Sequence, residues 1–213
     1  MTSNGLRIGV LGSGNGSNCE AILDACLPRS ERGGRAEIPG SVVVVLSDVP
    51  DAFILERARQ RGVPAKVIGP SRFKTKLEPE FEEEAVRTLR EADVELVALA
   101  GYMRVLKSPL LRAFAGKIMN VHPSLLPAFP GLRAWEQALE YGTKVTGCTV
   151  HFVDEGVDTG PIILQQPVPV FPNDSADSLH QRIQSVEHEL YPRAIRLFAE
   201  GKLQVVGRTV KIL

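Results

Sequence analysis

The sequence contains only three cysteines, and they make no recognisable pair. Cys19, Cys26 and Cys148 form no C-x-x-C motif, and no histidine stands at metal-ligand spacing from any of them. This excludes a disulfide framework and a cysteine-based zinc site as readings of the sequence. We expect the three thiols to be small buried hydrophobes in a reducing compartment.

The chain also lacks an excess of charge and a long apolar run. It balances 25 basic against 25 acidic side chains over 213 residues, so its overall charge does not attract nucleic acid or anionic lipid. Apolar runs such as 42–46 fall far short of the ~20 residues of a membrane span. The first residues show no secretory signal. We therefore expect a cytoplasmic protein with neither a nucleic-acid nor a membrane partner.

The remaining composition is that of an ordinary globular protein, with 44% hydrophobic residues, 19 glycines and 15 prolines. A chain of this length can form one domain with a full-sized core. Because we find no internal repeat and no linker, we predict a single domain over 1–213.

Short apolar runs alternate with helical segments through the first 121 residues. An uninterrupted β-branched run is typical of a strand buried on both faces of a parallel sheet. Strands separated by helices pair in parallel through right-handed crossovers. The sequence therefore predicts an α/β protein with a doubly wound, mostly parallel sheet. The expected strands are 8–11, 42–46, 65–68, 96–100 and 118–121; the expected helices begin at Ser17, Asp51 and Ser108, which act as caps, and at Pro79.

The last third of the chain has a different pattern. Two segments that read as strands, 146–153 and 162–170, flank the acidic loop 154–160, which predicts a mixed C-terminal part of the sheet. A helix is expected from Ser175, with Pro192 kinking or dividing it before Gly201. We also expect a terminal hairpin over 203–213 and a loop over 28–40.

A glycine-rich loop, Gly12-Ser13-Gly14-Asn15-Gly16, follows the first expected strand. A backbone free of Cβ atoms can approach an anion closely, and the N-terminus of the next helix favours negative charge. The loop matches neither the dinucleotide nor the triphosphate motif, but the short polar side chains of Ser17 and Asn18 suit a terminal monophosphate. The alternative is that the glycines only permit a tight turn.

Asn120 and His122 stand at the end of an expected strand. Residues two apart in a strand share a face, and Pro123 keeps His122 extended. The carboxyl end of a parallel strand is where an open α/β sheet holds its ligand. A carboxamide can stabilise an oxyanion, and an imidazole can move a proton near neutral pH, so the pair suits acyl chemistry. A purely structural histidine remains an alternative.

Asp158 lies in the acidic loop, between Val157 and the turn Thr159-Gly160-Pro161. A solvated loop or a weak cation site would explain its carboxylates, although the spacing of a calcium loop is absent. Acyl chemistry also needs a carboxylate that orients the imidazole and stabilises its protonated form, and Asp158 could supply it.

Four segments taken together resemble the phosphoribosylglycinamide formyltransferases, a folate-dependent family of purine synthesis. Each segment alone is shared with other formyl-folate enzymes, but the set in this order is specific, and the resemblance runs from about Arg7 to the end. The segments are GNGSN (14–18), LAGYMR (99–104), NVHPSLLP (120–127) and DEGVDTGP (154–161).

The resemblance implies a Rossmann-like formyltransferase fold and the transfer of a formyl group from 10-formyltetrahydrofolate, a co-substrate, to the amine of 5'-phosphoribosylglycinamide, without a metal. Asn120 matches the family's oxyanion-binding amide, His122 its proton-transferring imidazole, and Asp158 the carboxylate that raises the histidine pKa. Residues 1–100, approximately, would form the phosphate-binding half, and 101–213 the folate and catalytic half.

The same resemblance implies binding residues for both substrates. For the phosphate and ribose they are Gly16, Ser17, Asn18, Gln184 and Glu187. For the folate they are Lys76, Met103, Arg104, Val105, Leu106 and Asn120.

Three other functions remain open. A formyltetrahydrofolate hydrolase would use a similar catalytic set on water but carries an extra N-terminal domain, for which we expect no room before Arg7. A methionyl-tRNA formyltransferase needs an added C-terminal domain, whereas this chain ends neutral and short. A non-catalytic nucleotide-binding module needs only the glycine loop.

The sequence departs from some family members at Arg133-Ala134-Trp135, where they carry histidines, and in its long 28–40 loop. The sequence does not indicate the oligomeric state.

Overall fold

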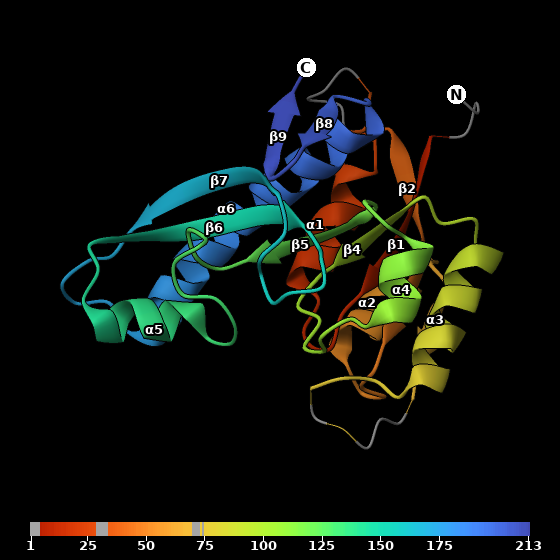
Figure 1. The fold of residues 1–213 in the computed structure, drawn as a ribbon, viewed down its shortest axis with the longest axis horizontal. Coiled ribbons are helices and arrows are strands. Elements are labelled where there is room, and N and C mark those ends of the chain that lie inside the picture. Colours follow the sequence, from red (N-terminus) through yellow and green to blue (C-terminus); the bar gives the residue numbers. More distant parts are fainter. Residues whose placement is uncertain (1–4, 29–33, 70–72, 74) are drawn as a thin grey trace. The chain divides into compact units, whose positions relative to one another are not determined.

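The computed structural model describes residues 5–28, 34–69, 73 and 75–213. The chain divides into two compact units, Met1–Met119 and Asn120–Leu213, which run from red to green and from green to blue in Figure 1. Within the described ranges, no helix combines the length and the apolar character that a membrane span requires.

Parallel strands form the sheet of the first unit. β1 (Leu6–Leu11) pairs with β2 (Gly40–Ser47) on one side and with β4 (Leu96–Leu99) on the other, and β3 (Ala65–Val67) pairs with β2. The strand order β3-β2-β1-β4 confirms the predicted parallel α/β arrangement. The helices that follow these strands along the chain are α1 (Ser17–Ala25), α2 (Phe53–Gln60), α3 (Pro79–Glu91) and α4 (Ser108–Ala113).

Three of the expected helix caps are wrong by one residue. α4 is capped by Lys107, not by Ser108. The other two are the caps of α1 and α2. α1 is capped by Gly16, not by Ser17, and Gly16 has a φ of 81°. A Cβ at Gly16 would lie 2.7 Å from the Cβ of Ile54, so glycine alone fits this left-handed turn. α2 is capped by Ala52, not by Asp51, and without a side-chain hydrogen bond. Backbone turns rather than polar side chains therefore set both helix starts.

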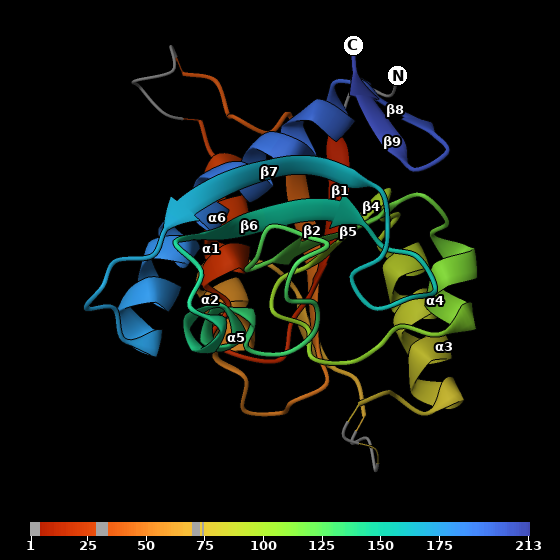
Figure 2. The same ribbon diagram turned by 60° about the vertical axis from the view of Figure 1, so that its left-hand side comes forward.

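The second unit has the predicted mixed pairing. β6 (Val145–Phe152) and β7 (Ile162–Pro169) are antiparallel, β7 and β9 (Thr209–Ile212) are parallel, and β8 (Leu203–Val206) and β9 form the expected terminal hairpin. Figure 2 shows α6 (Ala176–Ala199) running along β6 and β7, which it contacts. The remaining elements are β5 (Ile118–His122), at the boundary of the two units, and α5 (Ala134–Tyr141).

The long helix α6 does not divide at Pro192, contrary to the alternative that it would. Ser175 caps its N-terminus with a full capping box, and the helix continues through the proline to Ala199. A proline inside a helix costs about 3 kcal/mol. Leu190, Tyr191 and Ala194 around the proline are buried, so packing of this face offsets the lost backbone hydrogen bond.

Two further segments are the helix α5, which was not predicted, and the loop predicted over 28–40. The sequence reading contained no helix at α5, which has eight residues and no side-chain cap. Of the predicted loop 28–40, residues 29–33 lie outside the described part of the chain. Ile38, near its end, is fully buried and its amide donates to the Ala25 carbonyl, so that end of the segment packs on the first unit.

The three cysteines are free thiols. Burial raises the pKa of Cys19 to about 12, that of Cys26 to about 11 and that of Cys148 to about 12. A thiol with such a pKa stays protonated near neutral pH and is a poor nucleophile.

Candidate active site at the end of β5

The last residue of β5, His122, carries a buried imidazole. Asn120, two residues earlier on the same strand, is half-buried. Because side chains two apart share one face of a strand, the amide and the imidazole lie side by side, as the sequence pattern predicts. The strand end is therefore the place from which the candidate site is built.

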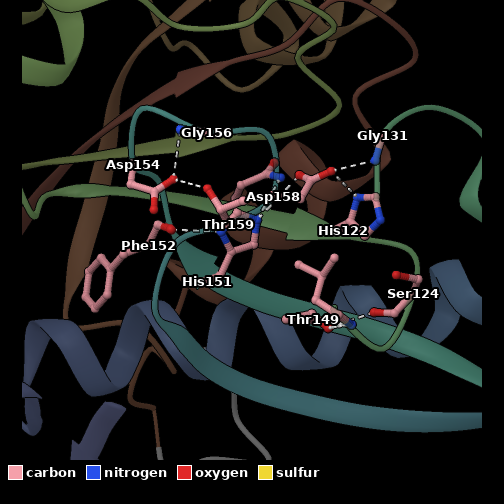
Figure 3. Close-up of polar contacts among 12 residues, drawn as sticks. His122, Ser124, Gly131, Thr149, His151, Phe152, Asp154, Gly156, Asp158 and Thr159 are labelled. Carbon is pink, nitrogen blue, oxygen red and sulfur yellow. Dashed lines mark hydrogen bonds and ion pairs between the residues drawn. The ribbon is translucent and has the colours of Figure 1, made fainter. Parts of the chain in front are cut away.

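The loop between β6 and β7 brings a carboxylate to this strand end. Asp158 Oδ2 lies 3.3 Å from His122 Nδ1, and it also accepts a hydrogen bond of 2.8 Å from the backbone N–H of Gly131 (Figure 3). Asp158 has a φ of 55°, a backbone conformation that residues with a side chain seldom adopt and that clusters at functional sites. His122 and Asp158 are thus in direct contact, as expected.

The other ring nitrogen of His122 has a fixed partner. Nε2 donates to the backbone carbonyl of Phe129 at 2.8 Å, and since a carbonyl oxygen only accepts, Nε2 carries a proton. Nδ1 is then the nitrogen that gains or loses a proton. At 3.3 Å its contact with Asp158 is longer than a charge-assisted hydrogen bond of about 2.7–2.9 Å. The ring is held through Nε2, while Nδ1 is free to exchange a proton.

Two opposing effects act on the His122 pKa. Burial lowers it below its ordinary value, and the charge of Asp158 and the Phe129 carbonyl partly reverse that shift. Burial raises the pKa of Asp158, but contacts with His151, His122 and the Gly131 amide outweigh it and hold that pKa below the usual range. Near neutral pH the Asp158 carboxylate is therefore charged and the His122 imidazole is neutral. Together they are suited to accepting one proton on the imidazole.

His151 is a member of the site that the sequence reading missed. It is buried near the end of β6, and its Nδ1 donates to the Phe152 carbonyl at 2.8 Å. In the neutral ring its Nε2 is an acceptor, 3.3 Å from the side-chain nitrogen of Asn120. In the protonated ring Nε2 carries a proton and lies 3.7 Å from Asp158 Oδ1, the interaction that lowers the Asp158 pKa. A histidine near the end of a strand that is buried along most of its length was the available signal. Neutral His151 thus fixes which way the Asn120 amide points, and among the described residues the Asn120 side-chain nitrogen has no second hydrogen-bond partner.

Replacing that acceptor tests the orientation of the amide. We expect His151→Leu to keep the fold and lower kcat about 10-fold, since loss of an outer partner typically costs 10- to 100-fold. Steady-state kinetics together with a melting curve check this. A kcat close to that of the unchanged protein would show that Asn120 needs no help from His151.

Close packing at Gly160 shapes the loop that carries Asp158. Asp154 Oδ1 accepts hydrogen bonds from the Gly156 amide and the Thr159 hydroxyl, at 3.1 and 2.6 Å. The Phe152 amide donates to the Pro161 carbonyl and closes the loop. A Cβ at Gly160 would lie 1.8 Å from the carbonyl oxygen of Phe152, so the two loop ends could not approach this closely with any other residue.

Gly160→Ala should therefore destabilise the protein. We expect the free energy of unfolding to fall by about 1–3 kcal/mol, the usual cost of overpacking, measured by urea denaturation. Gly14→Ala is the matched control, because a Cβ there meets nothing within 4 Å. Equal stability of the two variants would contradict this reading of the loop.

The predicted phosphate residues lie at the start of α1 in the first unit. Gly16 is the cap, and Ser17 and Asn18 follow in the first turn, where backbone N–H groups have no partner within the helix. Arg57 holds the preceding residue, Asn15, through its carbonyl and side-chain oxygen, both at 2.9 Å. A fixed turn followed by a helix N-terminus is a suitable anion site.

The predicted folate segment is tied to the glycine loop within the same unit. The Met103 amide donates to Ser13 Oγ at 2.9 Å, and Ser13 in turn donates to Asp48 at 2.6 Å. Arg104 forms an ion pair of 2.6 Å with buried Asp48. Ser13 and Asp48 were not among the predicted site residues. They join the two predicted binding segments through hydrogen bonds.

The other predicted folate residues flank this network. The Val105 amide donates to the Thr75 carbonyl at 2.8 Å, and Leu106 is buried. The Lys76 ammonium lies 4.4 Å from the centre of the Phe73 ring. In the second unit, Gln184 and Glu187 stand three residues apart on α6, with Glu187 buried and Gln184 half-buried. Three residues place two side chains on one helix face.

Two further features are a pocket and the distribution of the side chains that could bind a metal. A pocket of about 520 Å³ lies between α3 and α4, and no predicted site residue lines it. Among the residues that the structure places, no group of three His, Cys, Asp or Glu side chains could hold a metal ion.

Comparisons with known proteins agree on one family. Residues 6–195 match the family described as formyl transferase. Phosphoribosylglycinamide formyltransferase of Escherichia coli (strain K12) is 42% identical over 94% of this chain and 90% of that protein. Trifunctional purine biosynthetic protein adenosine-3 of Drosophila melanogaster is 47% identical over 92% of this chain, which spans only 14% of that longer protein. Glycinamide ribonucleotide transformylase 1 from Symbiobacterium toebii has a TM-score of 0.91 and 53% identity, covering 100% of this chain and 96% of that one.

Proposed function

Because the chain belongs to the formyl transferase family, we propose that it transfers a formyl group from 10-formyltetrahydrofolate to the amine of 5'-phosphoribosylglycinamide, a step of purine biosynthesis. One observation carries this proposal: His122, which shares β5 with Asn120, has its Nδ1 atom 3.3 Å from the Asp158 carboxylate. Formyl transfer needs an oxyanion donor and a proton carrier side by side, and these side chains supply both.

Asn120 is the proposed oxyanion donor. When the amine attacks the formyl carbon, negative charge develops on the formyl oxygen. One N–H of the Asn120 amide faces His151, and the second N–H is available for that oxygen. An amide already oriented by a neighbour need not reorganise during the reaction.

His122 is the proposed proton carrier. Its Nδ1 accepts the proton that the attacking amine loses and delivers it to the folate nitrogen. The bond between the formyl carbon and the folate nitrogen then breaks, while the new bond between the formyl carbon and the amine remains. Between these steps the ring is a cation, which Asp158 stabilises and which adds to the stabilisation of the oxyanion. The proton balance closes within the site, so the proposed transfer requires no metal.

We further propose that the predicted binding residues hold the two substrates. In the first unit, Gly16, Ser17 and Asn18 would bind the phosphate at the start of α1; in the second, Gln184 and Glu187 would bind the ribose. Lys76, Met103, Arg104, Val105 and Leu106, with Asn120, would bind the folate. We place this enzyme, which we propose to be a single domain, in the cytoplasm, where its three free thiols stay reduced.

An assay with and without the amine substrate tests the function. The purified protein is incubated with 10-formyltetrahydrofolate in the presence and in the absence of 5'-phosphoribosylglycinamide, and folate release is followed. We expect release only with the amine, together with a formylated product. Release without the amine would instead identify a formyltetrahydrofolate hydrolase, and binding without release would identify a non-catalytic module.

A further inference from the structure

The backbone segment before α5 touches both members of the proton-transfer pair. The Phe129 carbonyl receives the His122 Nε2 proton, and the Gly131 amide donates to Asp158. Phe129 and Arg133 have φ values of 51° and 53°, a left-handed backbone that persists only where surrounding contacts enforce it. Something must therefore hold the segment 129–133 in this conformation.

α5 supplies those holding contacts. The Gln137 side-chain amide donates to the carbonyls of Pro130 and Leu132, at 3.2 and 2.9 Å. The Phe129 ring packs edge-on against Tyr141 at a centroid distance of 5.8 Å. Because these contacts come from side chains of α5, a displacement of α5 would disturb the segment, and with it the backbone partners of His122 and Asp158.

A ring stack is one of the contacts that hold α5 against α6. The rings of Trp135 on α5 and His180 on α6 are 3.8 Å apart at their centroids and inclined by 3°. Both side chains are half-buried, and the two helices contact one another; α5 and α6 are labelled in Figure 1. A flat, offset contact of this kind fixes the rotation of a short helix as well as its distance.

We propose that the Trp135–His180 stack is a positioning device for the proposed formyl transfer: it fixes α5, and through the segment 129–133 it orients the His122 ring and the Asp158 carboxylate. Trp135 and His180 are positioning residues and do not contact the reacting atoms. His180 also precedes Gln184 by one turn of α6, so the helix proposed to hold the ribose is the same helix that anchors the catalytic pair. This inference rests on the proposed function.

Three single variants test the stack. His180→Ala removes the ring, His180→Phe restores a flat ring without the imidazole nitrogens, and Gln181→Ala is the matched control at the exposed neighbouring position on α6. We expect His180→Ala to lower kcat about 10-fold, in the range seen when an outer partner is lost, with little change in KM for the formyl-folate. His180→Phe should recover most of the loss, and Gln181→Ala should match the unchanged protein.

The fluorescence of Trp135 reports the stack directly, because it is the only tryptophan of the chain. We expect its emission to move to longer wavelength in His180→Ala and to return in His180→Phe. An emission shift without a fall in kcat, or an equal fall in kcat in both His180 variants, would overturn the proposal. So would an unshifted emission, which would mean that the rings do not stack.

A measurement that needs no turnover separates this proposal from the proposed function. The chain has four histidines, so the His122 ring signals can be assigned by NMR. If the unchanged protein transfers no formyl group, the proposed function fails, and the stack is judged on these signals alone. A shift of the His122 signals in His180→Ala, reversed in His180→Phe, supports the positioning role; identical signals in all three proteins overturn it.

Discussion

Asn120→Ala is expected to lower kcat about 10²- to 10³-fold, the usual effect of removing one oxyanion donor. The side chain is half-buried and its amide contacts His151, so its removal leaves β5 intact while the formyl oxygen loses its hydrogen bond in the transition state. Because the lost interaction forms mainly in the transition state, kcat should fall much more than KM rises.

Steady-state kinetics with both substrates measure this effect, and circular dichroism checks the fold. Asn173→Ala, at an exposed position before α6, is the matched control and should leave kcat unchanged. Near-normal turnover of Asn120→Ala would remove this residue from the mechanism.

Asp158→Asn should be comparably severe, lowering kcat by about 10²-fold or more, within the range of general acid–base contributions. The asparagine keeps one oxygen for the Gly131 amide, removes the negative charge and replaces the other oxygen by an NH2 group. Since that charge raises the His122 pKa against the effect of burial, its loss lowers the His122 pKa further. The acid limb of kcat, on which His122 must be neutral to accept the amine proton, should therefore move to lower pH.

A pH profile of kcat for Asp158→Asn, beside that of the exposed control Asp51→Asn, tests this sign. The control should reproduce the profile of the unchanged protein. An acid limb that stays in place, or moves to higher pH, would count against electrostatic coupling of Asp158 with His122.

Local patterns were sufficient for much of the fold and for the catalytic candidates. The β-branched run in β2 predicted a buried parallel strand, and the alternation along β5 predicted that Asn120 and His122 share a face. The pairing of His122 with Asp158, 36 residues later, was only a hypothesis at the level of sequence, because acyl chemistry and the family resemblance suggest such a carboxylate but no local pattern shows that the two side chains meet. The inferences about β2 and β5 succeed because they use periodicity and chemistry that the chain carries locally.

Features that depend on distant packing were not accessible from the sequence. α5 is short and has no capping side chain, and it is held in part by a stack on His180, 45 residues after Trp135. His151 looked like an ordinary residue of the strand 146–153, and its role depends on Asn120 lying beside it. The direction of the His122 pKa shift also differs from the simple expectation, because burial outweighs the charge of Asp158.

The coupling of imidazole and carboxylate is the central claim, and NMR titration of the His122 ring in the unchanged protein and in Asp158→Asn tests it most directly. We predict a His122 pKa below its ordinary value in the first protein and a still lower one in the second. The same pKa in both proteins, or a higher one in the variant, would mean that the two side chains do not share a proton-transfer role.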